Sequence, residues 1–230
     1  VKFEFKGFRP DLKIIGTIYA VGIPSIIMQS IGSIMTYCMN RILIEFSSTA
    51  TAVFGVYFKL QSFFFMPVFG LNNGITPIIA YNYGARQRKR MTKTIKLSLF
   101  VAFCLTFIGF VLFESIPQVL LGMFSASDDL LKIGIPALRT IGVHYLIAWY
   151  CIIVGTVFQA LGKAIFSMVV SIMRQLVVLI PAAYLLAKFG GLHMVWWSFP
   201  IAEIMSFIVS TAFLIRIWRT VIKDIPEGHE

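Results

Sequence analysis

Residues 97–113 read LSLFVAFCLTFIGFVLF, a stretch of 17 positions without one charged side chain. The stretch is the middle of an apolar run from about Ile95 to Ile116. As a helix rising ~1.5 Å per residue, such a run crosses the ~30 Å hydrocarbon core of a bilayer. A barrel strand would instead show about 10 residues of alternating polarity. We therefore predict an all-α, polytopic membrane protein.

Five further apolar runs are about as long or longer, so we predict six transmembrane helices. They span about 14–44, 50–81, 133–161, 164–187 and 194–218. The composition agrees, because 58% of the 230 residues are hydrophobic, 13% are charged and the mean hydropathy is +0.86. An ordinary soluble domain is roughly 25% charged, so that class is excluded, as are disordered chains and disulfide scaffolds.

The net charge of +10 would suggest nucleic-acid binding in a soluble protein, but its distribution here indicates membrane topology. Of the 20 basic residues, 14 fall in regions that six spans place on one side of the membrane. The positive-inside rule predicts that this side, with both termini, is cytoplasmic. We expect the membrane to be a bacterial plasma (inner) membrane. We expect membrane lipids as partners and no nucleic acid. A specific anionic-lipid site is the alternative role for the block of basic residues at 86–96.

The chain begins VKFEFK, without an initiator Met and without the apolar region of a signal peptide. We interpret it as part of a longer protein, entered through a linker. Cys38, Cys104 and Cys151 lie inside spans without CxxC spacing, so no metal site is expected.

Polar side chains follow one face of the first span, which carries Pro24 at its head. At about 100° per residue, five of them fall within an arc of about 80°. They are Ser25, Gln29, Ser33, Thr36 and Asn40. Such a stripe indicates that the helix lines a solvated cavity, and hydrogen bonding between helices is the alternative.

In the second span, Lys59 and Asn73 lie on one face, and Pro67 and Pro77 favour a bent helix, a device common at transport sites. Lys59 either faces the cavity or reaches the outer interface with its long side chain.

Ionisable residues inside a span are costly and are therefore functional candidates. Arg174 and Glu203 both fall near mid-membrane on consecutive antiparallel helices, so we expect either a structural ion pair or a carboxylate that binds a coupling ion. His144 and the nearby Trp149, in the fourth span, are candidate cavity residues. The chain has no nucleotide-binding loop and no clustered Asp, His or Ser for catalysis, so no enzyme activity is predicted.

Three stretches together resemble the multidrug and toxic compound extrusion (MATE) family. They are GLNNGITPIIAYNYGA at 70–85, FQALGK at 158–163 and GIPS at 22–25 followed by Gln29. The resemblance implies two lobes of six helices, of which this chain would be the C-terminal one, helices seven to twelve. Residues 1–13 would be the cytoplasmic inter-lobe linker, 14–219 the lobe and 220–230 a cytoplasmic tail, with the N-terminal lobe as partner.

The resemblance also implies efflux of drug-like cationic or amphipathic compounds by alternating access, coupled to H⁺ or Na⁺ and requiring no other cofactor. This chain departs from members that have an acidic cation site in helices seven and ten. Its first and fourth spans contain no mid-span Asp or Glu, so a coupling carboxylate in this lobe would have to be Glu203. Flipping of a lipid-linked precursor is the alternative function, and Lys59, Arg139 and Arg174 would favour it.

Overall fold

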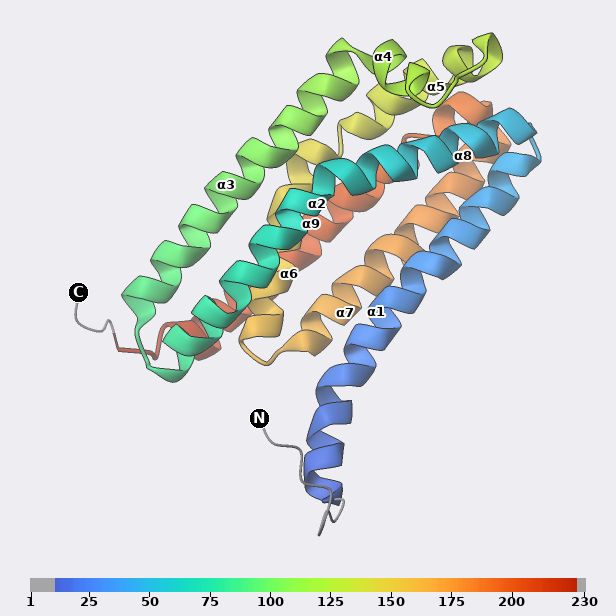
Figure 1. Cartoon of the computed structure of the whole chain (residues 1–230). Coiled ribbons are helices and arrows are strands. Elements are labelled where there is room, and N and C mark those ends of the chain that lie inside the picture. Colours follow the sequence, from blue (N-terminus) through green and yellow to red (C-terminus); the bar gives the residue numbers. More distant parts are fainter. Residues whose placement is uncertain (1–10, 227–230) are drawn as a thin grey trace, which may run out of the picture.

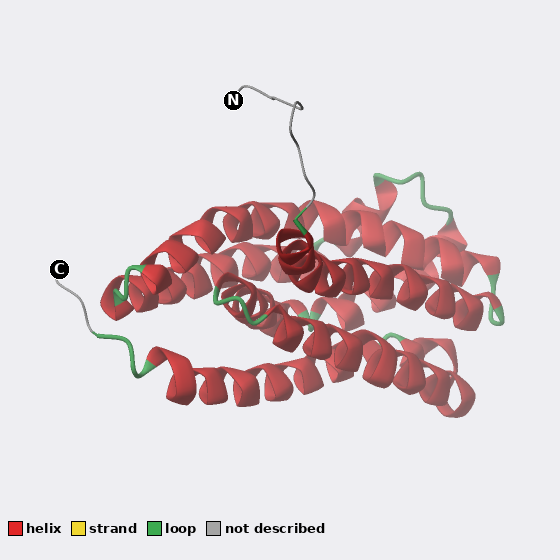
Figure 2. Ribbon diagram, turned by 90° about the horizontal axis from the view of Figure 1, so that it is seen from below, coloured by secondary structure: helices red, strands yellow, loops and turns green. Residues whose placement is uncertain are grey.

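The computed structural model describes residues 11–226, and the predicted linker and tail at 1–10 and 227–230 lie outside the described residues. Within residues 11–226 the chain is helical and contains no strand (Figure 2). The helices are α1 (Leu12–Ile44), α2 (Ser48–Gly84), α3 (Arg88–Ser115), α4 (Pro117–Gly122), α5 (Asp128–Gly142), α6 (Tyr145–Ala160), α7 (Ala164–Ile172), α8 (Ile180–Val195) and α9 (Ser198–Ile217), with the π-helical segments η1 (Met173–Leu179) and η2 (Trp218–Ile222).

The helices run up and down the long axis of the molecule (Figure 1). The start of α1, the α2–α3 turn, the α6–α7 turn and η2 lie at one end, and the α1–α2 turn, α4, α5 and the α8–α9 turn lie at the other. We call these the basic end and the opposite end. α1 begins at Leu12, so the helix already includes the last two residues of the predicted linker.

Between residues 11 and 226, five stretches are long and apolar enough to cross a membrane: α1, α2, α3, α7–η1–α8 and α9–η2. The remaining predicted span, the fourth at 133–161, is formed by α5 and α6, which meet at an angle of 52°. The chain bends at His144, whose ring Nδ1 is hydrogen-bonded to the Ile141 carbonyl. The His144 backbone N–H also donates to the Ile141 carbonyl, at 3.0 Å, so the hydrogen bonds at the bend span three residues instead of the four of a regular α-helix.

Local sequence signals explain where several helices begin. Ser47 precedes α2 and accepts a hydrogen bond from Ala50 N at 3.0 Å, and Ser127 precedes α5 and accepts one from Leu130 N at 3.3 Å. These side chains satisfy backbone donors that have no partner within the helix. Asp128 in the first turn of α5 adds a favourable interaction with the helix dipole.

The buried core consists of two clusters. One surrounds Tyr57, Phe113, Tyr145 and Trp196 toward the opposite end, and the other includes Met91 and joins α2, α3, α6 and α9 toward the basic end. Many large apolar side chains remain exposed, such as those of Leu97 and Phe100, as expected where hydrocarbon rather than water is the surrounding solvent.

Candidate functional site

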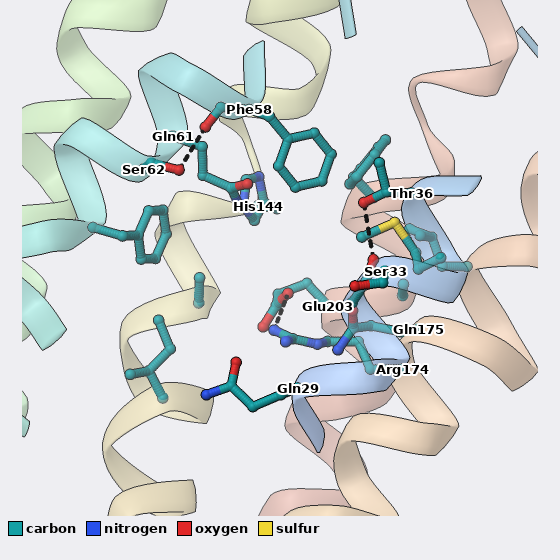
Figure 3. A pocket seen from close by; sticks show the side chains of 18 of the residues that line it. Gln29, Ser33, Thr36, Phe58, Gln61, Ser62, His144, Arg174, Gln175 and Glu203 are labelled. Atoms are coloured by element: carbon teal, nitrogen blue, oxygen red, sulfur yellow. Dashed lines mark hydrogen bonds and ion pairs between the residues drawn. The ribbon is translucent and has the colours of Figure 1, made fainter. Parts of the chain in front are cut away.

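A cavity of about 860 Å³ lies between α1, α2, α6, η1 and α9. Figure 3 shows its polar side chains directed toward a common space. Seven residues that the sequence singled out line it: Gln29, Ser33, Thr36, Asn40, His144, Arg174 and Glu203. The cavity therefore collects polar groups from helical segments that are far apart in the sequence.

α1 supplies one polar wall of this cavity. Gln29, Ser33, Thr36 and Asn40 all face it, which follows from their spacing of three and four residues. The Thr36 hydroxyl donates a hydrogen bond to the Gly32 carbonyl at 2.9 Å, so the proton of this hydroxyl is already bound within α1.

Arg174 on η1 and Glu203 on α9 form an ion pair at the cavity wall, with 3.4 Å between Arg174 Nη1 and Glu203 Oε2. The two partners differ in exposure, because the Glu203 side chain is 5% exposed and the Arg174 side chain 31%. The second carboxylate oxygen, Oε1, is buried without a hydrogen-bond partner. A buried polar atom of this kind ordinarily binds a water, an ion or a proton, so Glu203 can accept a further ligand.

The polar surface around Glu203 continues along α9. Ser206 and Ser210 are each 1% exposed, and neither hydroxyl has a hydrogen-bond partner in the described part of the protein. The thiol of Cys151 on α6 lies close to Glu203 and Ser206 without meeting hydrogen-bond geometry to either of them. Hydroxyl groups buried in this way favour internal water in the α6–α9 interface beside the cavity.

The opposite wall of the cavity is aromatic. The ring of Phe65 lies parallel to that of His144, with 6.2 Å between the centroids, and Phe58, Phe69 and Phe199 complete this wall. His144 Nε2 lies 3.5 Å from Gln61 Nε2. Aromatic faces beside a polar wall suit an organic cation, because the rings attract positive charge and bury apolar surface.

Three residues predicted to line a cavity lie outside this one. Lys59 is exposed, and its Nζ lies 5.8 Å from the ring centroid of Phe124 near the opposite end. Asn73 is exposed on α2, and the Trp149 indole donates a hydrogen bond to the Leu146 carbonyl and packs against Phe103. Ser62, on the same face of α2 as Lys59 and Asn73, does line the cavity, so the cavity meets this face over only part of its length.

Two glutamines of the cavity were absent from the sequence-based prediction. Gln61 lines the cavity beside His144, and Gln175 lines it beside Arg174. Arg174 and Gln175 are consecutive and would diverge by about 100° on a regular α-helix. They lie in the π-helical segment η1, where hydrogen bonds reach one residue further and side chains are redirected, as is frequent at functional sites. Polarity within an apolar run was the signal that could have identified both.

Comparison with known proteins places this geometry in context. The model of the family MatE matches residues 24–185. The multidrug export protein MepA of Staphylococcus aureus (strain MSSA476) is 25% identical over 205 residues, which are 88% of this chain and 45% of that protein. MepA of Staphylococcus haemolyticus (strain JCSC1435) is 28% identical over 214 residues, 88% of this chain and 44% of that protein.

Solved structures share the fold. The MATE multidrug transporter DinF-BH is 32% identical with a TM-score of 0.80, over 94% of this chain and 49% of that one. A MOP superfamily transporter from Pyrococcus furiosus is 22% identical with a TM-score of 0.86, over 97% of this chain and 51% of that one. The chain thus spans about half the length of the curated relatives it matches.

Proposed function

Because the chain belongs to the MatE family, whose multidrug export proteins are transporters rather than enzymes, we propose that it forms one lobe of a multidrug efflux transporter. Two such lobes, twelve helices in all, would export organic cationic or amphipathic compounds by alternating access. The chain would be the C-terminal lobe, the N-terminal lobe would supply the facing wall of the substrate path, and the basic end would be cytoplasmic. The matched length, about half of the relatives, supports this arrangement.

The observation that carries the proposal is the cavity with one polar and one aromatic wall beside the Arg174–Glu203 pair. Its volume of about 860 Å³ lies within the range of roughly 300–1,000 Å³ that holds drug-sized ligands. Amide and hydroxyl groups on α1 would orient a ligand, and phenylalanine rings would bury its apolar part. Transport sites are commonly built in this way, near mid-membrane and from interrupted helices.

Glu203 would couple substrate export to H⁺ or Na⁺ entry. With Glu203 ionised, its charge cancels that of Arg174, and the cavity tolerates a cationic substrate. A proton on the carboxylate, or a Na⁺ ion bound to it, leaves one uncompensated positive charge, which repels the same substrate. The coupling ion and the substrate would exclude each other electrostatically. Entry of the ion would therefore be coupled to export of the substrate in the opposite direction, as in an antiporter.

The test uses the full-length transporter that contains this chain, reconstituted in vesicles. A fluorescent lipophilic cation such as ethidium reports transport under an imposed H⁺ or Na⁺ gradient. Glu203→Gln, which imitates a permanently neutral carboxyl, is expected to keep the fold and abolish gradient-driven transport. Glu114→Gln, which neutralises a partly exposed carboxylate outside the cavity, serves as the control. Unchanged gradient-driven transport by Glu203→Gln would refute the coupling role.

The structure does not favour the alternative, flipping of a lipid-linked precursor. Such a substrate would be served by a strongly cationic cavity, but Lys59 contacts Phe124 and Arg139 lies 4.0 Å from Glu114. Among the described residues that line the cavity, Arg174 is the only Lys or Arg, and it is paired with Glu203.

A further inference from the structure

A second pocket, of about 540 Å³, lies at the basic end, where the start of α3 faces η2. Its lining residues are Arg88, Lys89, Thr92, Lys93, Lys96 and Trp218. Four of these six side chains are cationic, and none of the described residues that line the pocket is acidic. A pocket with this lining is complementary to an anion.

The position of these cations at the start of a helix strengthens this interpretation. The N-terminal end of a helix carries partial positive charge, so cations there are unfavourable and anions favourable. α3 begins with Arg88, Lys89 and Arg90, has no acidic residue in its first turn, and lacks a side-chain cap from Gln87. Helix α5, by contrast, begins with Asp128 and Asp129. An anion bound at the start of α3 would therefore interact favourably with the helix as well as with the side chains.

The wall of the pocket is held in place from the other side. The Arg88 guanidinium donates a hydrogen bond to the Lys223 carbonyl at 2.8 Å, and the Arg88 backbone N–H donates one to the Pro226 carbonyl at 3.3 Å. These contacts join the start of α3 to the residues that follow η2. The pocket is thus a defined feature between two segments rather than a loose group of surface side chains.

The face of α3 that carries the lysines continues as an apolar stripe toward the middle of the membrane. Lys89, Lys93 and Lys96 are followed at the same spacing by Phe100, Phe103 and Phe107. At about 100° per residue all six fall within about 80° of one another. The three phenylalanines are 64%, 37% and 42% exposed. One continuous surface therefore offers cations at the membrane boundary and exposed rings at the depth of the acyl chains.

We propose that this pocket binds the phosphate headgroup of an anionic phospholipid, whose acyl chain lies along the phenylalanines of α3. A free phosphate ion would contact the cations alone, whereas a phospholipid would contact the cations and the apolar stripe at the same time. Trp218, 40% exposed at the edge of the pocket, has the amphipathic ring that is enriched at the membrane–water boundary. The site is independent of the transport cavity and does not rest on the function proposed above.

The test compares two double variants that remove the same charge from the same region. Lys93→Gln/Lys96→Gln removes two cations that line the pocket, and Arg86→Gln/Arg90→Gln removes two neighbouring cations that do not. Native mass spectrometry of the purified protein would measure binding of phosphatidylglycerol and, for comparison, phosphatidylcholine. At about 1 kcal/mol per cation, we expect the first variant to lose roughly 30-fold in affinity for phosphatidylglycerol. The second variant is expected to bind nearly as the unmodified protein does.

Three results would overturn the proposal. Equal losses in the two variants would show that the lipid is attracted by the summed charge of the basic end and is not held in this pocket. Equal binding of phosphatidylglycerol and phosphatidylcholine by the unmodified protein would exclude an anion site. Displacement of phosphatidylglycerol by millimolar inorganic phosphate would identify a phosphate site that does not need the acyl chain. Resistance to inorganic phosphate, with selective loss in Lys93→Gln/Lys96→Gln, is the outcome that supports the lipid.

Discussion

The asymmetry of the Arg174–Glu203 pair makes a quantitative prediction about stability. Arg174→Met keeps most of the apolar stem but removes the guanidinium, and it leaves Glu203 buried with neither carboxylate oxygen bound. Loss of one partner from a buried pair typically costs about 3–5 kcal/mol. Glu203→Gln leaves the opposite partner alone, but the Arg174 side chain is 31% exposed and can be solvated through the cavity. Its cost should approach the ~1 kcal/mol of a surface pair.

The assay is the apparent melting temperature in detergent, read as the monodisperse fraction after heating. Taking about 3 kcal/mol for Arg174→Met and ~2–4 °C per kcal/mol for a chain of this size, we expect it to melt roughly 6–12 °C lower. Glu203→Gln should melt only about 2–4 °C lower, at ~1 kcal/mol. The double variant should be more stable than Arg174→Met alone, because the unpaired buried charge is gone. A larger loss in Glu203→Gln than in Arg174→Met, or strictly additive losses, would refute this account.

Four further outcomes are expected. Ser33→Trp should fill the cavity and lower ethidium transport roughly tenfold or more. Ile34→Trp, at an exposed neighbouring position, should leave transport unchanged, and equal effects of the two variants would argue against the cavity as the substrate site. Gly109→Val should lower the free energy of unfolding by about 1–3 kcal/mol, because an added Cβ would lie 3.0 Å from a tyrosine ring. A Cβ added at Gly74 meets nothing within 4 Å, so Gly74→Val should keep the melting temperature close to that of the unmodified protein. Ser125→Cys, in a background without the native cysteines, should react with an impermeant thiol reagent from outside intact cells; labelling only after permeabilisation would reverse the topology. Vesicles that contain this chain alone should not take up ethidium under an ion gradient, and uptake above empty vesicles would show that a single lobe suffices.

The parts of the fold and of the candidate site that could be predicted from sequence depend on local patterns. An apolar run is long enough to span a bilayer whatever surrounds it, so the helical membrane fold and the approximate boundaries of α1 and α2 followed from hydropathy. The start of α3 did not, because the helix continues beyond the apolar run through the basic residues back to Arg88. The α1 stripe from Gln29 to Asn40 also faces one cavity, because its spacing repeats with the helix period over several turns. Arg174 and Glu203 could be placed at similar depth by counting residues from the ends of their spans.

The features that failed or were missed depend on which neighbour each helix meets. Hydropathy is an average over a run and does not register the bend at His144, where the backbone hydrogen bonds span three residues instead of four. Lys59 and Asn73 lie on the same face of α2 as residues that line the cavity. The helices packed around α2 determine how far the cavity extends along it, and the cavity reaches neither of these two side chains.

The amino-acid sequence by itself thus determined that this chain crosses the membrane as helices, and it predicts a topology from the distribution of charges, because both depend on transfer free energies summed along the chain. Only the tertiary structure decided that Gln175 joins Arg174 at the cavity and that Glu203 keeps one oxygen unbound. Those outcomes depend on the π-helical segment η1 and on the packing of η1 and α9 around a shared space. The periodicity of one segment does not specify which distant segment it contacts.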